Sequence, residues 1–322
     1  MTCIKRLLWL VYISPLFLSA CVTMRHCPIE TLLPAKIAFE GVPKKNIIIC
    51  APQTLLSEAI ISNGSVTNVP SDSLIANILF SLLQIWKNTP GYEEAQMSCN
   101  ILKTDEPAKN SNFDLMVQLE SLQIKNTYYG QGYSYMEWEA YLVTQYTAKW
   151  TILNASGTLL DEYADRNLMD WNSGIHTGKM EAVMSLPDVK DAWWDLGIVV
   201  ARNYATRILP RWQTGTRDIF MINKFPELSQ QAYTAMLNDG YARAFDIWEN
   251  MLMQCRKHGQ KKAKSRIFHN MAVAWEFQNQ LDEAIYWAQR SANLNLQSRT
   301  VNYLNLLKER KQNQIKLDQQ VN

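Results

Sequence analysis

Two kinds of hydrophobic pattern follow one another along the chain. Residues 44–222 mix short apolar runs and alternating segments with helical patterns, whereas residues 229–317 carry helical patterns alone. Alternation with a period of two is typical of strands, and recurrence every three or four residues is typical of helices. The chain is therefore predicted to contain an α/β domain over 44–222 and an all-α region over 229–317.

The strand patterns lie in the first of these domains. Residues 47–50 form an apolar run that ends near Pro52, as in a buried strand. Residues 113–119 alternate, and between Met136 and Ile152 the apolar residues keep one parity over a long segment. Residues 154–157 are typical of a hairpin turn, so 158–163 is predicted to return as a strand. Residues 216–222 are predicted to be a last edge strand.

Two helices are predicted to interrupt these strands. Apolar residues recur at helical spacing between Leu74 and Trp86, and Pro90 ends that pattern. A second helix is predicted between Pro187 and Pro210. The resulting order, β-α-β-β-β-α-β, resembles the periplasmic α/β domain of curli-secretion-type outer-membrane lipoproteins. That resemblance implies a sheet with helices and carries no function.

The C-terminal region resembles tetratricopeptide repeats. Residues 270–275 and 280–292 carry small residues at Ala272, Ala284 and Ala288, which let two helices approach closely. A partial unit around Ala244 lies 40 residues earlier, and the excess over the usual 34 is predicted to be a loop at 255–266. Residues 304–317 are predicted to form a capping helix, and 318–322 a frayed tail.

The resemblance to these repeats implies a surface that binds another protein, because stacked helix pairs present a concave face. The expected contact residues are Tyr241, Trp248, Asn270 and Trp275. The alternative is that the helices only cap the α/β domain.

The N-terminus has the pattern of an export signal. Lys5 and Arg6 precede an apolar run over 7–20 that is too short to span a membrane. The residues before Cys21 resemble a bacterial lipobox, which implies cleavage after residue 20 and lipid attached to Cys21. The alternative is an ordinary signal peptide that happens to carry a cysteine. Residues 21–43, with Pro28 and Pro34, are predicted to be a linker.

The residues after Cys21 favour the periplasmic face of the outer membrane. An Asp directly after the cysteine would resemble an inner-membrane retention signal, and Val22 stands there instead. Over nearly its whole mature length the chain resembles an uncharacterised family of Bacteroides-type lipoproteins, through the lipobox, residues 34–37 and the terminal helix pair. That family has no assigned activity, so the resemblance implies a domain of unknown function.

Composition and motifs argue against catalysis. The chain has 32 basic and 30 acidic residues, a balance that argues against nucleic acid as a main partner. The histidines His26, His176, His258 and His269 lack metal-ligand spacing, and no nucleotide-binding or hydrolase motif occurs. We therefore expect no metal, no cofactor and no enzyme activity. Disulfide pairing among Cys27, Cys50, Cys99 and Cys255 stays open.

Two functions remain from different classes. The first is a lipid-anchored scaffold at the outer membrane that binds an unidentified envelope protein, with the α/β domain as a possible site of homo-oligomerisation. The second is a glycan- or ligand-binding lipoprotein that uses the tyrosine-rich hairpin at 128–135, where aromatic faces suit sugar rings. Its candidate residues are Tyr128, Tyr129, Tyr133 and Tyr135. Strand packing and protein contact are the alternatives for these tyrosines. The basic run at 256–266 is interpreted as a solvated loop, or as a contact with anionic lipid headgroups or an acidic partner.

Overall fold

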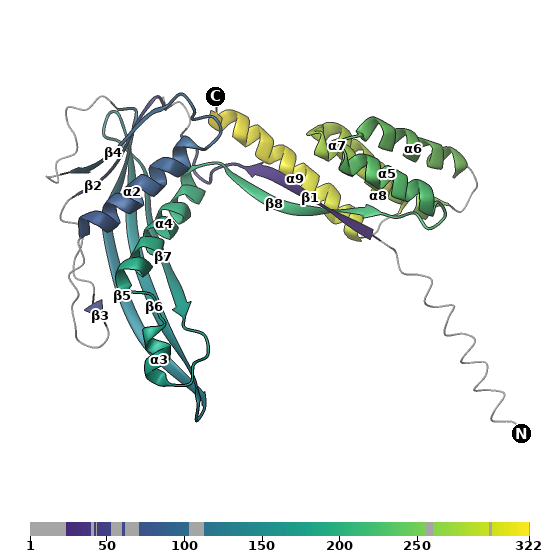
Figure 1. The fold of residues 1–322 in the computed structure, drawn as a ribbon. Coiled ribbons are helices and arrows are strands. Elements are labelled where there is room, and N and C mark those ends of the chain that lie inside the picture. Colours follow the sequence, from purple (N-terminus) through teal and green to yellow (C-terminus); the bar gives the residue numbers. More distant parts are fainter. Residues whose placement is uncertain are drawn as a thin grey trace, which may run out of the picture. The chain divides into compact units, whose positions relative to one another are not determined.

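The protein folds into two compact units. A computed structural model describes residues 24–39, 42, 44–52, 60–61, 71–102, 113–255, 260–295 and 298–321 (Figure 1). The sheet unit comprises Pro34–Arg211 and the C-terminal residues from Leu317, and the helical unit comprises the chain up to Leu33 and Trp212–Lys316.

The sheet unit is built on a mixed sheet of six strands. These are β2 (Asn46–Pro52), β3 (Ile60–Ile61), β4 (Gln96–Leu102), β5 (Leu115–Ser134), β6 (Glu137–Asn154) and β7 (Leu159–Asn172). The strand order is β4-β2-β5-β6-β7, and β3 pairs with β5. Strand β2 runs parallel to β4 and β5, whereas β5, β6 and β7 are antiparallel. The sequence analysis did not assign β4, although its Met97, Cys99 and Ile101 alternate with polar residues and pack half-buried against the core.

Helices α2 (Ser71–Lys87) and α4 (Val189–Ile208) lie side by side against the sheet (Figure 1). Both correspond to the predicted helices. Their apolar faces pack in one core with the side chains of β5 and β6 that point inward. Within it the Trp150 and Tyr204 rings stack with centroids 4.4 Å apart. Aromatic stacking of this kind adds to the burial of two large side chains.

The two helices cross at a glycine. A Cβ atom on Gly197 would lie 2.5 Å from Nδ2 of Asn77, closer than real Cβ contacts. The same Asn77 amide donates a hydrogen bond of 2.8 Å to the carbonyl oxygen of Trp194. The absence of a side chain at residue 197 therefore allows α2 to hydrogen-bond the backbone of α4.

A two-stranded arm extends beyond the rest of the sheet. Strand β7 ends where Asn172 pairs with Tyr141, while β5 and β6 continue to a turn at Tyr135 and Met136. We call residues 128–141 the arm; it reaches the lower end of the sheet unit in Figure 1. The short helix α3 (Lys179–Met184) packs against it. Within the predicted tyrosine-rich hairpin at 128–135, residues 128–134 are therefore part of strand β5.

The helical unit begins with a strand where a linker was predicted. Strand β1 (Met24–Leu33) pairs with β8 (Arg211–Phe220) in a separate two-stranded sheet. The linker prediction over 21–43 is therefore wrong for 24–33, and the predicted edge strand at 216–222 pairs with β1 instead of closing the larger sheet. Pro28 misled the prediction, because proline is tolerated in strands that have an open edge.

Five helices complete this unit: α5 (Pro226–Leu237), α6 (Tyr241–Gln254), α7 (Lys261–Phe277), α8 (Leu281–Leu294) and α9 (Ser298–Val321). Helices α5 and α6 pack together, as do α7 and α8. The predicted loop at 255–266 is wrong from Lys261 onward, where α7 already begins. The predicted tail at 318–322 is helical to Val321.

The end of α9 belongs to the sheet unit. The side-chain amide of Gln320 accepts a hydrogen bond of 2.9 Å from the Ala35 N–H and donates one of 3.0 Å to the Ala35 carbonyl. The Lys44 ammonium also donates to the backbone carbonyl of Gln320. These buried contacts explain why the chain does not fray before residue 321.

The turns within the two helix pairs have the same backbone geometry. Asp239 and Asn279 adopt φ values of 57° and 58°, in the left-handed region where Asn and Asp are favoured. In each turn the next N–H donates to the carbonyl five residues earlier, Gly240 to Ala235 at 2.9 Å and Gln280 to Trp275 at 3.0 Å. This arrangement closes the end of the first helix.

The close approach of α2 and α4 at Gly197 predicts that adding one methyl group there lowers stability. Gly197→Ala should lower the free energy of unfolding of the sheet unit by about 1–3 kcal/mol, because the Asn77 amide must move away. Gly178→Ala is the matched control, since nothing lies within 4 Å of its Cβ position. Chemical unfolding measures both, and equal stability of the two variants would contradict the close approach.

Candidate functional site

Two of the residues expected to contact a partner are inside the helical unit. The Asn270 side chain donates to the carbonyl of Phe220 and accepts from its N–H, both at 2.8 Å. Trp248 is 1% exposed in the core between the helices. The expectation that these two side chains bind a partner is therefore wrong, because Asn270 binds the chain's own strand β8.

The other two expected contact residues are half-buried. Trp275 lies against Phe245 with ring centroids 4.8 Å apart. The Tyr241 hydroxyl donates to the Asp239 carboxylate at 2.9 Å, which ties the residue to the turn before α6. A role for Tyr241 and Trp275 in binding stays a prediction.

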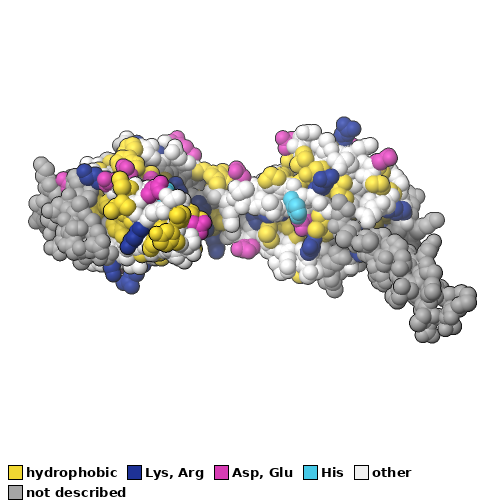
Figure 2. All heavy atoms as spheres, turned by 60° about the horizontal axis from the view of Figure 1, so that its bottom comes forward, with side chains coloured by type: hydrophobic (Ala, Val, Ile, Leu, Met, Phe, Trp, Pro, Cys, Tyr) yellow, Lys and Arg dark blue, Asp and Glu magenta, His cyan; other side chains and the backbone are white. Residues whose placement is uncertain are grey.

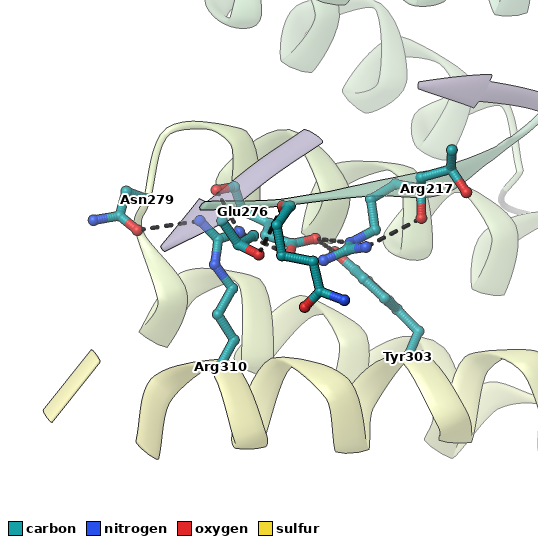
Figure 3. A network of polar contacts seen from close by, with 8 residues as sticks. Arg217, Glu276, Asn279, Tyr303 and Arg310 are labelled. Carbon is teal, nitrogen blue, oxygen red and sulfur yellow. Dashed lines mark hydrogen bonds and ion pairs between the residues drawn. The ribbon is translucent and has the colours of Figure 1, made fainter. Parts of the chain in front are cut away.

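A buried carboxylate organises the interior of the helical unit (Figure 3). The Glu276 side chain is 0% exposed and accepts hydrogen bonds from Arg217 Nε and Nη2, both at 2.7 Å. The Tyr303 hydroxyl and Arg310 Nη1 donate to the same carboxylate at 2.8 Å. Four donors from β8 and α9 therefore saturate one side chain of α7.

The charges fix the protonation states in this cluster. Burial opposes ionisation of Glu276, but its hydrogen bonds to Arg217 and Arg310 outweigh burial and hold the carboxyl pKa below its usual value. Burial, together with the carboxylate, raises the pKa of Tyr303. A saturated carboxylate beside two guanidinium groups is not available for proton transfer, so the cluster holds helices and strand together.

His269 is buried next to this cluster. Its Nε2 donates to the Asp218 carbonyl at 3.0 Å, and its ring packs against Phe220 and Tyr303. Burial lowers the pKa of His269 to about 4, so the imidazole is neutral at pH 7. Its position is that of a core residue.

The remaining chemical candidates do not assemble into a site. Cys27, Cys50, Cys99 and Cys255 are free thiols, and burial raises the pKa of Cys50 to about 12. Within the described residues no group of His, Cys, Asp and Glu side chains is arranged to hold a metal ion. Cys21, His258, Arg256 and Lys257 lie outside the described residues.

The tyrosines predicted to bind glycan are distributed over two faces of the arm. Tyr129 and Tyr141 stack with centroids 4.8 Å apart, and the hydroxyls of Tyr133 and Tyr141 donate to the Glu139 carboxylate. These hydrogen bonds lower the pKa of Glu139. Tyr128 follows the opposite parity and faces the other side of the ribbon. The structure thus brings together Tyr129 and Tyr133, with Tyr141 and Glu139 as neighbours; Glu139 is the one that the sequence had not singled out.

The end of the arm exposes an unusual number of large apolar side chains. Tyr135 is 93% exposed and Met136 63%. Helix α3 adds Met180 at 73% and Met184 at 77%, and Ile175 precedes it. Hydrophobic side chains gather on the forward face of the sheet unit in Figure 2. We call Tyr135, Met136, Ile175, Met180 and Met184 the arm surface. Exposed apolar patches of this kind mark interaction sites.

The sequence analysis missed α3 because six residues are too few for a helical period to show. The available signal was a group of apolar residues, Met180, Val183 and Met184, in an otherwise polar segment. Which of these side chains are exposed depends on the tertiary packing, since Ala182 points inward whereas Met180 and Met184 point outward.

Residues 89–220 match a domain of unknown function, DUF8603. Residues 230–309 match a second domain of unknown function, DUF6340. The first match covers β4 to β8 and the second covers most of the helical unit. No curated protein matches the chain. The two matches agree with the expectation of domains without an assigned activity.

Two solved structures resemble part of the chain at low scores. One is a neuraminyllactose-binding hemagglutinin homolog from Helicobacter pylori, 11% identical with a TM-score of 0.28, covering 51% of this chain and 86% of that one. The other is a minor lipoprotein from Acinetobacter baumannii, 12% identical with a TM-score of 0.28, covering 52% and 98%. A TM-score of 0.28 supports no inference about ligands. No described helix is long and apolar enough to cross a membrane.

Replacing the buried Glu276 carboxylate by an amide should have a large effect on stability. Glu276→Gln should destabilise the helical unit by about 3–5 kcal/mol, because the buried guanidinium of Arg217 and the half-buried one of Arg310 lose their counter-charge. Asp282→Asn is the matched control: its ion pair with Lys311 is exposed, and exposed pairs contribute at most about 1 kcal/mol. Urea unfolding distinguishes them, and a similar small loss in both variants would show that Glu276 is not a central contact.

His269 predicts a pH dependence of stability. Its folded pKa of about 4 lies below the unfolded value near 6.5, so the unfolded chain binds more protons. Stability should therefore fall as the pH drops from 6.5 to 4, by about 3 kcal/mol. His269→Gln keeps an N–H donor and should flatten this part of the curve. Parallel curves for wild type and His269→Gln would contradict the assignment.

Proposed function

We propose that the chain is a lipid-anchored, non-catalytic protein of the bacterial outer membrane that binds another envelope protein through the arm surface. The export signal and the lipobox at Cys21 support the anchor and the periplasm-facing location. Several acyl chains on one cysteine hold a protein stably at a membrane. The physiological process in which the partner takes part is not specified by this proposal.

The observation that carries the proposal is the exposure of the arm surface. Five large apolar side chains, two at the turn of the hairpin and three in or just before α3, remain 63–93% exposed. Burying them against a partner is favourable by about 25 cal/mol for each Å² of apolar area removed from water. Methionine side chains, two of them on α3, adapt to differently shaped partners. The arm surface therefore suits contact with a protein.

The helical unit acts in this proposal as a rigid body with tetratricopeptide-like helix pairs. Positions 40 residues apart are buried alike, such as Ala232 and Ala272, or Ala244 and Ala284. The turns with positive φ at Asp239 and Asn279 follow the same spacing. The Asn270 side chain on α7 is already hydrogen-bonded to Phe220 of β8. The arm surface is therefore a better candidate for partner binding than this face of α7.

A second candidate function is glycan binding on the other end of the same arm. The outer face of the Tyr129–Tyr141 stack is accessible, since Tyr129 is 50% exposed. The Glu139 carboxylate beside it accepts hydrogen bonds, as a sugar hydroxyl would require. Stacking on tyrosine together with a carboxylate is a chemistry suited to saccharides.

Site-specific photo-crosslinking in cells tests the protein-binding proposal. A crosslinker at Met180 or Met184 should capture one envelope protein, identified by mass spectrometry, and Met180→Asp with Met184→Asp should abolish the capture of that protein by a crosslinker at Tyr135. Met253 on α6, also exposed, is the matched control position. Capture should also depend on Cys21, because Cys21→Ala removes the anchor.

The outcomes separate the two candidate functions. Loss of capture in the double Asp variant, with capture retained in Met253→Asp, supports the arm surface. Saccharide binding that survives the double Asp variant and is lost in Tyr129→Ala with Tyr133→Ala supports the glycan function instead. Equal capture from Met180 and Met253 would overturn the proposed surface.

A further inference from the structure

Two arginines meet at one end of the helical unit, and neither is paired with an acidic side chain of the described residues. Arg266 on α7 is 8% exposed, and its enclosed Nε has no hydrogen-bond partner. Burial lowers the pKa of this guanidinium. Arg299 in the first turn of α9 is exposed, and its Nη1 donates to the Met24 sulfur at 2.7 Å. Burying a guanidinium is costly unless an anion or several acceptors compensate it, so Arg266 is suited to binding an anion.

The register of α7 and α9 places the two arginines on facing sides of these helices. The rings of His269 and Tyr303 lie with centroids 4.7 Å apart. The contact of the Glu276 carboxylate with α9 lies seven residues further along both helices, so the helices run parallel here. Residues three or four apart share one helix face. Arg266 therefore precedes His269 by one turn on α7, just as Arg299 precedes Tyr303 by one turn on α9.

The two strands of the helical unit bring the same side chains together. Two side-chain contacts between β1 and β8 fit one antiparallel register, which places Met24 opposite Phe220. Arg299 contacts the first of these residues, and the guanidinium carbon of Arg266 lies 5.7 Å from the ring centroid of the second. Opposite residues of two strands have Cβ atoms about 5 Å apart. The two guanidinium groups therefore converge on neighbouring strand residues, as two others do on Glu276.

The chain segments around the two arginines are basic. Residues 21–25, 255–266 and 295–299 contain no Asp or Glu. The first turn of α7 has no acidic residue and carries Lys261, Lys262 and Lys264. Clustered charge of one sign attracts the opposite sign and repels its own. This end of the helical unit is therefore suited to an anionic partner.

We propose that Arg266 and Arg299 bind the phosphate group of an anionic phospholipid in the membrane that holds the anchor. The inference rests on the proposed function, because it takes Cys21 as the lipid-bearing residue. Met24 follows Cys21 by three residues, which limits the distance between their Cα atoms to about 11 Å. The end of the unit at which Arg299 contacts Met24 therefore lies at the membrane surface when the anchor is inserted.

The chemistry of the two side chains fits a lipid phosphate. Phosphate oxygens accept paired hydrogen bonds from the planar guanidinium group. Basic residues beside a lipid anchor add to membrane binding by attracting anionic headgroups. A second point of attachment at Arg266 and Arg299 would also fix how the helical unit faces the membrane, because a single flexible tether leaves it free to rotate.

Native mass spectrometry of the full lipidated chain in detergent tests the site, with phosphatidylglycerol and phosphatidylcholine as probes. Wild type should retain phosphatidylglycerol in preference to phosphatidylcholine. Arg266→Met keeps the apolar stem and removes the charge, and it should weaken phosphatidylglycerol binding by about tenfold or more, as should Arg299→Gln. Arg243→Gln on α6, also exposed, is the matched control and should bind like wild type. Phosphatidylglycerol should raise the unfolding temperature of wild type and of the control, and leave that of the two site variants unchanged.

The outcomes separate a lipid site from the alternatives. Phosphatidylglycerol binding that is lost in both site variants and kept in Arg243→Gln supports the site. Equal binding by all four chains, or no preference over phosphatidylcholine, would overturn it. Displacement of phosphatidylglycerol by inorganic phosphate would overturn it as well, since the site would then take free phosphate. Arg299→Gln decides the matter alone if Arg266→Met unfolds.

The same measurement distinguishes this inference from the proposed function. The mass of the chain shows whether Cys21 carries lipid, which tests the anchor itself. An anchored chain that does not bind phosphatidylglycerol, but still captures an envelope protein through Met180, would leave the proposed function standing.

Discussion

The pairing of β5 with β6 is the interaction on which the sheet unit depends. The ladder runs from Leu115 opposite Asn154 to the turn at Tyr135 and Met136. Its first half lies under α2 and α4 and supplies the inward residues of the core, including Trp150. Its last pairs, from Gly130 opposite Ala140 onward, extend past β7 and lead to the exposed side chains of Tyr135 and Met136. One hairpin thus provides both the stability of the unit and the surface that we propose for binding, because its length exceeds what the helices cover.

The helical unit depends on a different kind of contact. Glu276 lies 40 residues after Met236, and both side chains are buried at corresponding points of the two helix pairs. A methionine there needs only apolar neighbours, whereas a carboxylate needs counter-charges and donors. Arg217 from β8, with Tyr303 and Arg310 from α9, provides them. Strand β8 and helix α9 are therefore joined to α7 by a polar interaction, and removing any of its partners would leave a buried charge unpaired.

Sequence patterns were reliable where one face of an element is buried. The long one-parity run of β6 and the apolar faces of α2 and α4 predicted those elements, because burial on one side leaves a period in the sequence. The strand β1 and the helix α3 left no such period, because β1 contains a proline and α3 has only six residues. Strand β4 does alternate, but its apolar residues are only half-buried, and it was not predicted. Their positions follow from partners that are distant in the sequence.

The candidate residues show the same division. By itself the sequence determined the two kinds of periodicity and the tyrosine-rich segment, since these depend on neighbouring residues alone, and the export signal is a prediction from the same kind of local pattern. Only the tertiary structure decided that Asn270 binds β8, that Glu276 is buried and saturated, and that Met180 and Met184 face solvent. The physical reason is that burial and hydrogen-bond partners are properties of contacts between segments far apart in the chain, and no local pattern encodes them.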